Sequence, residues 1–322
     1  MINIISRSAV SNRTSGPKKV VSNLIKGLEK IGYPYVVNAR LDACPRLWIH
    51  DDTDALLRVP KLKDVSVIVG PNLYVNSREI PTGLDLSTTL YVQPSSWAMN
   101  LWTQQGFLTP MSAWPVGIDT DAFAASTSPK EHVLVYFKKR SLEELAYAEA
   151  LLSERSIPYE VVRYGTYDEG TYQDLLAKSR YVLWIGCPES QGIALEEALA
   201  SNVPVLVWDS SGTWGTDTGA TTAPYFDDQC GIVIDEKNQL ANAITQMEGA
   251  LESFSPRSYV LENLTLEKQA RDFVDLYTNR FGLSYEDGLS EKVRHPGTWK
   301  NATMRYRLYQ SLKDAAKAVL KR

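Results

Sequence analysis

Short apolar runs alternate with amphipathic segments along most of the chain. Runs with the length of buried strands occur at residues 2–5, 35–38, 47–50, 65–69, 89–92, 132–137, 159–163, 181–185 and 203–208. Segments with apolar residues at helical spacing lie between them or after them, at 17–31, 94–106, 142–155, 171–179, 190–201, 239–251 and 265–281. This alternation predicts an α/β fold with parallel sheets covered by helices on both faces.

The chain is expected to contain two such domains and a tail. The segment from Pro115 to Lys130 is rich in Gly, Pro, Ser, Thr and Ala, has few large apolar residues after Phe123, and is typical of a linker. We therefore expect an N-terminal domain over residues 1–124, a second domain over 125–282, and a tail over 283–322.

The last part of this tail, Asn301 to Arg322, carries six basic residues and one acidic residue, with apolar residues at helical spacing. It is interpreted either as a helix that packs back on the body of the protein or as a basic amphipathic helix on an anionic membrane surface.

Composition and charge exclude several classes of protein. The 322 residues include 44% hydrophobic and 22% charged residues, as in an ordinary globular protein. The net charge of −4 argues against a general nucleic-acid binder. Three widely separated cysteines fit neither a disulfide framework nor a zinc site, and no run approaches the roughly 18 apolar residues of a membrane helix. A cytoplasmic protein is expected, either free or peripheral at the inner face of a membrane through its tail.

The segment from Tyr181 to Asp209 is the most informative for chemistry. A buried strand is expected to end at Gly186, and a helix to begin with Ser190, Gln191 and Gly192 in its first turn. In open α/β sheets ligands bind at the carboxyl ends of the strands. The free N–H groups of a helix start favour an anion there, and Gly192 lets a ligand approach the backbone.

Two acidic residues, Glu189 and Glu197, flank this helix start. If all the residues between them are helical, their separation along the axis is on the order of 12 Å. They would then be too far apart to share one reacting atom, but could hold the two ends of an extended ligand. The alternative is that Glu196 and Glu197 belong to the solvated face of the helix.

This segment resembles the donor-binding core of the GT-B glycosyltransferases of group 1, also called family 4. The resemblance rests on an E-x7-E pattern with a Gly three positions after the first Glu (Glu189, Gly192, Glu197), followed by a small-residue helix end and Pro204-Val205. Two further matches are Trp114 to Phe123, similar to the family's PxGxDxxxF segment, and Gln93 to Trp97, similar to its PS-x-W strand end. The resemblance to this family implies two Rossmann-like doubly wound domains that face a central cleft.

By resemblance, Glu189 contacts the donor sugar, Glu197 hydrogen-bonds the ribose, and the backbone from Gln191 through Gly192 to Ile193 approaches the sugar and phosphates. Three bases, Lys138, Lys139 and Arg140, come after the first strand of the second domain, where they can neutralise a diphosphate. Glu189, Lys139 and Arg140, together with Asn72 of the first domain, are the expected catalytic residues. Lys138 is expected to bind the donor, although which of the three bases points inward is open. Tyr164 and Gly165 either contact the nucleobase or form a plain turn.

The first domain departs from the family pattern. Gly16, in the loop from Thr14 to Pro17, stands in for a Gly-Gly loop. Asn72 occupies the place of a His that faces the donor sugar in many members; His50 is an alternative for that role or a structural residue. In the second domain, Asp209 to Trp214 replaces a GG-x-x-E motif.

The resemblance implies transfer of a sugar from a UDP- or GDP-type nucleotide sugar with retention and without a metal or other cofactor. The acceptor, whether a saccharide, a lipid-linked molecule or a protein, is not specified. A nucleotide-sugar epimerase and a non-catalytic nucleotide-sugar binding protein are the alternatives.

Overall fold

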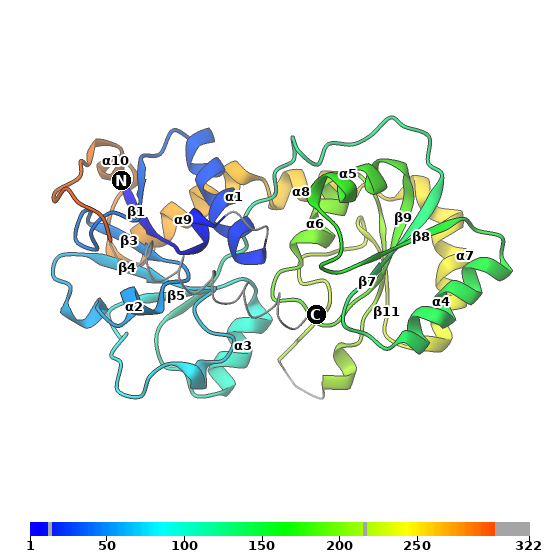
Figure 1. The fold of residues 1–322 in the computed structure, drawn as a ribbon, viewed down its shortest axis with the longest axis horizontal. Helices are drawn as coiled ribbons and strands as arrows, with labels where there is room; N and C mark the ends of the chain where they lie inside the picture. Colours follow the sequence, from blue (N-terminus) through cyan, green and yellow to red (C-terminus); the bar gives the residue numbers. More distant parts are fainter. Residues whose placement is uncertain (12–14, 215–217, 300–322) are drawn as a thin grey trace, which may run out of the picture. The chain divides into compact units, whose positions relative to one another are not determined.

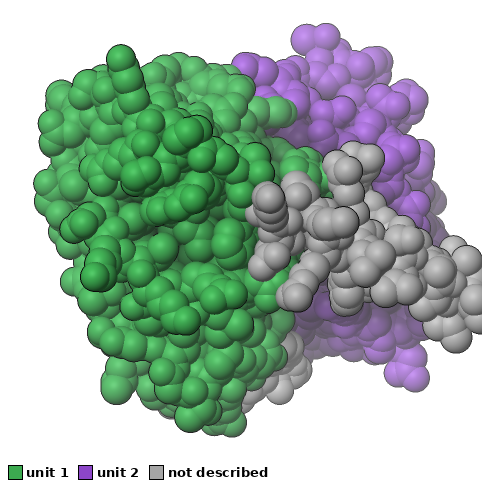
Figure 2. Space-filling view, turned by 60° about the vertical axis from the view of Figure 1, so that its left-hand side comes forward, with its two compact units in different colours: residues 1–116, 267–322 green, residues 117–266 purple. Residues whose placement is uncertain are grey.

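The computed structural model describes residues 1–11, 15–214 and 218–299. The chain forms two compact units (Figure 2). The second unit comprises residues 117–266, and the first comprises residues 1–116 together with the chain from Glu267 onward.

The second unit is built on a five-stranded sheet in the order β11-β10-β9-β7-β8, with all strands parallel. Its strands are β7 (His132–Phe137), β8 (Tyr159–Arg163), β9 (Ser179–Ile185), β10 (Val205–Trp208) and β11 (Gly231–Ile234). The chain passes from β7 to β8 on one side, and then continues with β9 on the other side of β7. The strand order therefore reverses between β7 and β9, which is where ligands bind in open α/β sheets.

Helices cover both faces of this sheet (Figure 1). One face is covered by α5 (Glu169–Lys178), α6 (Ile193–Ala200) and α8 (Pro256–Asn263), and the other by α4 (Leu142–Glu154) and α7 (Leu240–Ala250). Alternate residues of β7 enter the two cores: Leu134 and Tyr136 lie on the α6 face, and Val133 and Val135 on the α4 face. Because both faces are buried, the central strands β7 and β10 are almost entirely apolar.

The first unit is built on a six-stranded parallel sheet in the order β2-β1-β3-β4-β5-β6. Its strands are β1 (Ile2–Ile5), β2 (Tyr35–Val37), β3 (Arg46–Ile49), β4 (Ser66–Val69), β5 (Leu90–Gln93) and β6 (Met111–Ala113). Its helices are α1 (Gly16–Lys30), α2 (Thr53–Leu56), α3 (Ser96–Gln104), α9 (Leu266–Phe281) and α10 (Tyr285–Ser290). The ring of Trp48 on β3 packs against Phe273 of α9, with centroids 5.1 Å apart. The predicted fold class, α/β with two Rossmann-like doubly wound domains, is confirmed.

Several short elements were not expected from the sequence. The strands β6 and β11 lie at sheet edges and are partly exposed, so they lack the continuous apolar run of the central strands. The helices α2, α8 and α10 span only 4, 8 and 6 residues, too few for helical periodicity to stand out.

The boundaries of the two units differ from the expected domain limits of 124 and 282. The chain leaves the first unit after Val116 and returns to it at Glu267, so α9 packs in the first unit. The expected linker begins too early, because Ile118 and Phe123 are buried in the core of the second unit. At Gly117 a Cβ atom would lie 2.6 Å from the carbonyl oxygen of Thr265, which explains a glycine here. The basic segment from Asn301 lies outside the described residues.

None of the helices within the described ranges combines the length and the apolar character needed to cross a lipid bilayer.

Candidate functional site

The carboxyl ends of β7 and β9 bring two predicted site residues together in the second unit. Phe137 and Ile185 are paired in register, so Lys138 and the loop after Ile185 leave the sheet at the same level. Lys138 Nζ lies 2.5 Å from Glu189 Oε1, and each of the two side chains is 14% exposed. A partly buried ion pair thus occupies the point where the strand order reverses.

The side chains of the three consecutive basic residues after β7, Lys138, Lys139 and Arg140, lie in different surroundings. Lys138 forms the ion pair with Glu189, and its ammonium lies 4.2 Å from the ring centroid of Tyr164. Lys139 is exposed and has a φ of 53°, in the left-handed region, so the chain bends between the two other bases. Lys138 is therefore the base that contacts Glu189, and the catalytic role predicted for Lys139 stays a prediction.

Arg140 is engaged with the protein itself. Its Nη1 donates to the carbonyl oxygens of Gly186 at 3.0 Å and Trp208 at 3.1 Å, and its Nε donates to Glu144 at 2.9 Å. The guanidinium also stacks on the Trp208 ring, 5.0 Å from the centroid. Arg140 thus joins the ends of β9 and β10 to the first turn of α4. Its predicted catalytic role stays a prediction.

The loop from Gly186 to Gly192 is anchored by a polar cluster around Asp209, at the end of β10. Asp209 accepts hydrogen bonds from the hydroxyl groups of Thr221 at 2.8 Å and Thr222 at 2.7 Å. The carbonyl oxygen of Thr221 in turn accepts from the backbone N–H of Glu189 at 3.0 Å. Asp209 is not among the site residues predicted from the sequence. Its position, an acid at the end of a buried strand with threonines nearby in the sequence, is the feature that could have indicated it.

The helix after Glu189 begins later than predicted. Gly192 has a φ of 94°, so it caps the helix in a left-handed conformation, and Ser190 and Gln191 precede α6. The helical rise therefore does not set the separation of Glu189 and Glu197. Glu197 is 3% exposed and not part of a solvated face.

The start of α6 lies directly after the loop from Gly186 to Gly192. Its N-cap residue, Gly192, has no side chain that could accept a hydrogen bond from the first turn. The N–H groups of Ile193 and Ala194 have no intrahelical partner by the geometry of a helix start, and both residues are partly exposed. Such a start favours an anionic group.

Tyr164 and Gly165 lie beside this site, directly after β8. Tyr164 is 52% exposed, and Gly165 has a φ of 81° in a turn. Tyr167, which was not among the predicted site residues, hydrogen-bonds Tyr136 through the two hydroxyl groups at 2.8 Å. Burial raises the pKa of Tyr167 to about 12, and the charge of Glu197 contributes in the same direction. Tyr167 therefore lies near the predicted ribose-binding carboxylate as a neutral phenol.

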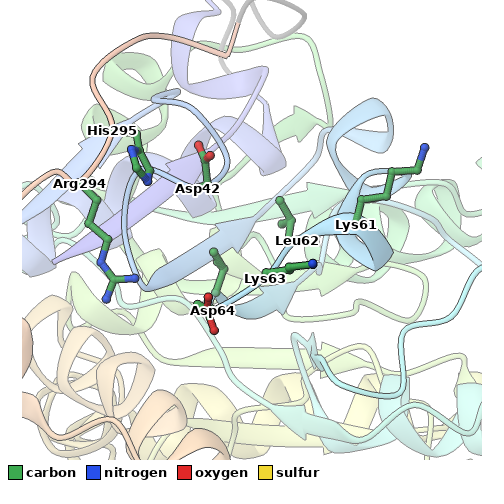
Figure 3. A pocket seen from close by; sticks show the side chains of 8 residues that line it. Asp42, Lys61, Leu62, Lys63, Asp64, Arg294 and His295 are labelled. Carbon is green, nitrogen blue, oxygen red and sulfur yellow. The ribbon is translucent and has the colours of Figure 1, made fainter.

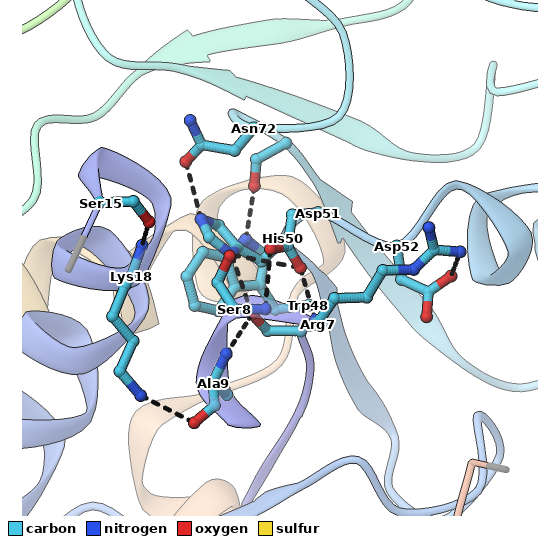
Figure 4. A network of polar contacts seen from close by, with 12 residues as sticks. Arg7, Ser8, Ala9, Ser15, Lys18, Trp48, His50, Asp51, Asp52 and Asn72 are labelled. Atoms are coloured by element: carbon cyan, nitrogen blue, oxygen red, sulfur yellow. Dashed lines mark hydrogen bonds and ion pairs between the residues drawn. The ribbon is translucent and has the colours of Figure 1, made fainter. Parts of the chain in front are cut away.

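The carboxyl end of the sheet in the first unit holds a second polar network (Figure 4). His50 is fully buried after β3; its Nδ1 lies 3.1 Å from Ser6 Oγ, and its Nε2 lies 2.7 Å from Asn72 Oδ1. Both candidates for the family's histidine are thus in direct contact. Gly16 is exposed at the first position of α1, which is capped by the side chain of Ser15.

Asp51 stabilises this network electrostatically. Burial opposes its charge, but His50 and the backbone N–H groups of Arg7 at 2.7 Å and Ser8 at 2.9 Å outweigh burial and lower the pKa of Asp51 to about 2. A depressed carboxyl pKa stabilises the fold above the unfolded value of 3.8, and this contribution is lost as the pH falls through about 2.

We therefore expect Asp51→Asn to lower the free energy of unfolding at pH 7 by roughly 2 kcal/mol. The difference between the variant and the wild type should shrink between pH 4 and pH 2, which urea unfolding at several pH values measures. A constant difference across this range would contradict the assignment.

A shallow cavity of about 310 Å³ lies elsewhere in the first unit (Figure 3). Its lining includes Asp42, before β3, and Lys63 and Asp64, before β4, so it lies at the amino ends of the strands. Lys61 and Arg294 extend in different directions in Figure 3. Its mixed, exposed charges are those of a solvated depression on the surface.

Comparisons with known proteins identify the fold. No family model and no curated protein matches the sequence. Among solved structures, a sucrose-phosphate synthase from Thermosynechococcus elongatus superposes with a TM-score of 0.61 at 14% identity, covering 88% of this chain and 99% of that one. The catalytic domain of starch synthase IV from Arabidopsis thaliana gives 0.57 at 10% identity, covering 88% and 99%. The lipopolysaccharide outer core galactosyltransferase WaaB gives 0.56 at 10% identity, covering 87% and 99%. The chain has the fold of the GT-B glycosyltransferases.

Proposed function

We propose that this protein is a retaining glycosyltransferase that moves a sugar from a nucleoside diphosphate sugar to an acceptor. The observation that carries the proposal is the Lys138–Glu189 ion pair beside the start of α6, at the point where the strand order of the second unit reverses. A cation and helix N–H groups suit a diphosphate, and carboxylates suit the hydroxyl groups of a sugar.

The residues have complementary roles in this proposal. Lys138 and the N–H groups at the start of α6 stabilise the charge that develops on the leaving nucleoside diphosphate. Glu189 turns from Lys138 to the hydroxyl groups of the donor sugar, and Glu197 accepts hydrogen bonds from the ribose. Tyr164, which is 52% exposed, offers an aromatic face to the nucleobase.

The fold supports the proposed donor. The starch synthase structure of the same fold was determined with ADP and acarbose bound, so this fold holds a nucleoside diphosphate in at least one other protein. The proposed donor is of the UDP or GDP type, and the acceptor is a saccharide, a lipid-linked molecule or a protein.

A ligand screen tests the proposal. We expect UDP or GDP, and one of their sugars, to stabilise the protein; at a concentration 100 times Kd the stabilisation is about 2.7 kcal/mol. The stabilising nucleotide sugar should then yield a glycosylated product with a panel of acceptors. An isomerised nucleotide sugar formed without acceptor would instead identify an epimerase, and stabilisation without any product a binding protein. No stabilisation by any nucleotide would contradict a nucleotide-sugar site.

A further inference from the structure

A buried polar pair joins the loop before α6 to the first turns of this helix. Gln191 is 5% exposed and Glu196 is 1% exposed. The Nε2 of Gln191 donates to Glu196 Oε2 at 2.9 Å. Since Gly192 is the N-cap of α6, Gln191 stands one residue before the cap and Glu196 four residues after it.

These are the two positions of a hydrophobic staple, in which apolar side chains pack together and fix the angle at which the chain enters a helix. Here a hydrogen bond between two polar side chains occupies the place of that apolar contact. The loop whose direction it fixes also carries Glu189, whose backbone N–H is bound by Thr221 on the other side.

The buried carboxyl group of Glu196 lowers the stability of the folded protein. Burial raises its pKa well above the ordinary value, the hydrogen bond from Gln191 opposes this rise, and the charges of Glu197 and Glu189 add to it. Its Oε1 is buried and has no hydrogen-bond partner among the described residues. Leaving a buried polar atom unsatisfied costs about 1–3 kcal/mol, so an apolar residue would be the better choice for stability alone.

We propose that Gln191 and Glu196 form a polar staple that positions the backbone of Gln191 and Gly192 for the donor diphosphate. Glu196 is a positioning residue, since it acts through Gln191 and is too buried to contact a ligand itself. This inference rests on the proposed function, because it assigns the pair to the same donor site.

Substitutions at the two positions separate positioning from simple packing. In Glu196→Leu and in Gln191→Met the remaining polar partner loses this hydrogen bond, and we expect affinity for UDP or GDP to fall about tenfold. The double variant restores a hydrophobic staple and should bind within about threefold of the wild type. Glu196→Gln keeps an acceptor for Gln191 and should also bind like the wild type.

Two measurements test whether the Gln191–Glu196 pair positions the loop: the affinity for a nucleotide and the order of the loop in the free protein. Titration calorimetry with UDP and GDP gives the affinities, and amide hydrogen exchange over residues 187–195 of the free protein reports the order of the loop. We expect faster exchange of these amides in each single apolar variant than in the wild type. The double variant and Glu196→Gln should exchange at the wild-type rate. The melting temperatures of the four variants are not expected to follow the ranking of their exchange rates.

The outcomes distinguish this inference from the proposed function. If the wild type binds a nucleotide but the single apolar variants bind equally well, or exchange no faster in the loop, the staple has no positioning role. If the wild type binds no nucleoside diphosphate, the proposed function fails, and with it the assignment of the pair to a donor site, whatever the exchange rates show.

Discussion

Replacing Lys138 with Met is expected to weaken the binding of UDP or GDP by roughly 30-fold or more. The Lys138 ammonium lies 2.5 Å from a Glu189 oxygen, and both side chains are mostly buried. In the proposed complex this ammonium contacts the diphosphate, and a hydrogen bond to a charged group contributes about 1.5–3 kcal/mol. In this variant the Glu189 carboxylate would also repel the incoming diphosphate. Calorimetric titration with each nucleotide measures the loss.

Lys139→Met is the matched control. The two residues are adjacent and carry the same charge, but Lys139 is exposed and its φ of 53° is the same strain for Lys and for Met. We expect its affinity to stay within about threefold of the wild type, as for a screened surface charge. The opposite order of effects would show that Lys139 is the base that binds the phosphates.

Replacing Arg140 with Ala is expected to lower the stability of the second unit by about 3 kcal/mol, which for a unit of this size lowers the melting temperature by roughly 10 °C. Its guanidinium bonds the carbonyl oxygens of Gly186 and Trp208 and the carboxylate of Glu144. Without it, these groups lose their charged donor near the ends of two strands. Thermal unfolding monitored by circular dichroism measures the change.

The variant Arg140→Lys separates the contribution of the planar guanidinium to stability from the contribution of its charge. A lysine keeps the charge but lacks the planar fork that serves two carbonyls and a carboxylate at once, so we expect it to recover less than half of the lost stability. Unchanged stability in Arg140→Ala, together with a large loss of nucleotide affinity, would instead favour the catalytic role predicted for this residue from the sequence.

The central strands and the position of the site could be predicted because burial on both faces demands continuous apolar runs. Residues 133–137 and 181–185 are such runs, and the residues directly after each run must lie at the carboxyl edge of the sheet. The pairing of Lys138 with Glu189 depends on β7 and β9 being neighbours, which the strand order decides and the local sequence does not.

The sequence pattern was insufficient where tertiary contacts decide the conformation. The start of α6 was predicted three residues early, because Ser190 is a common cap residue and the left-handed conformation of Gly192 is not visible in a helical period. The sequence also allows Glu196 to lie on a solvated helix face, since a pair of acids on a helix is usually exposed. Only the packed structure shows its burial and its contact with Gln191.

The most direct test of the proposed donor site is a crystal structure of the protein soaked with UDP or GDP, whichever nucleotide stabilises it. We expect the diphosphate to lie within hydrogen-bond distance of Lys138 Nζ and of the backbone N–H groups at the start of α6, with Glu189 released from Lys138. A diphosphate bound elsewhere, with the Lys138–Glu189 ion pair intact, would contradict this assignment.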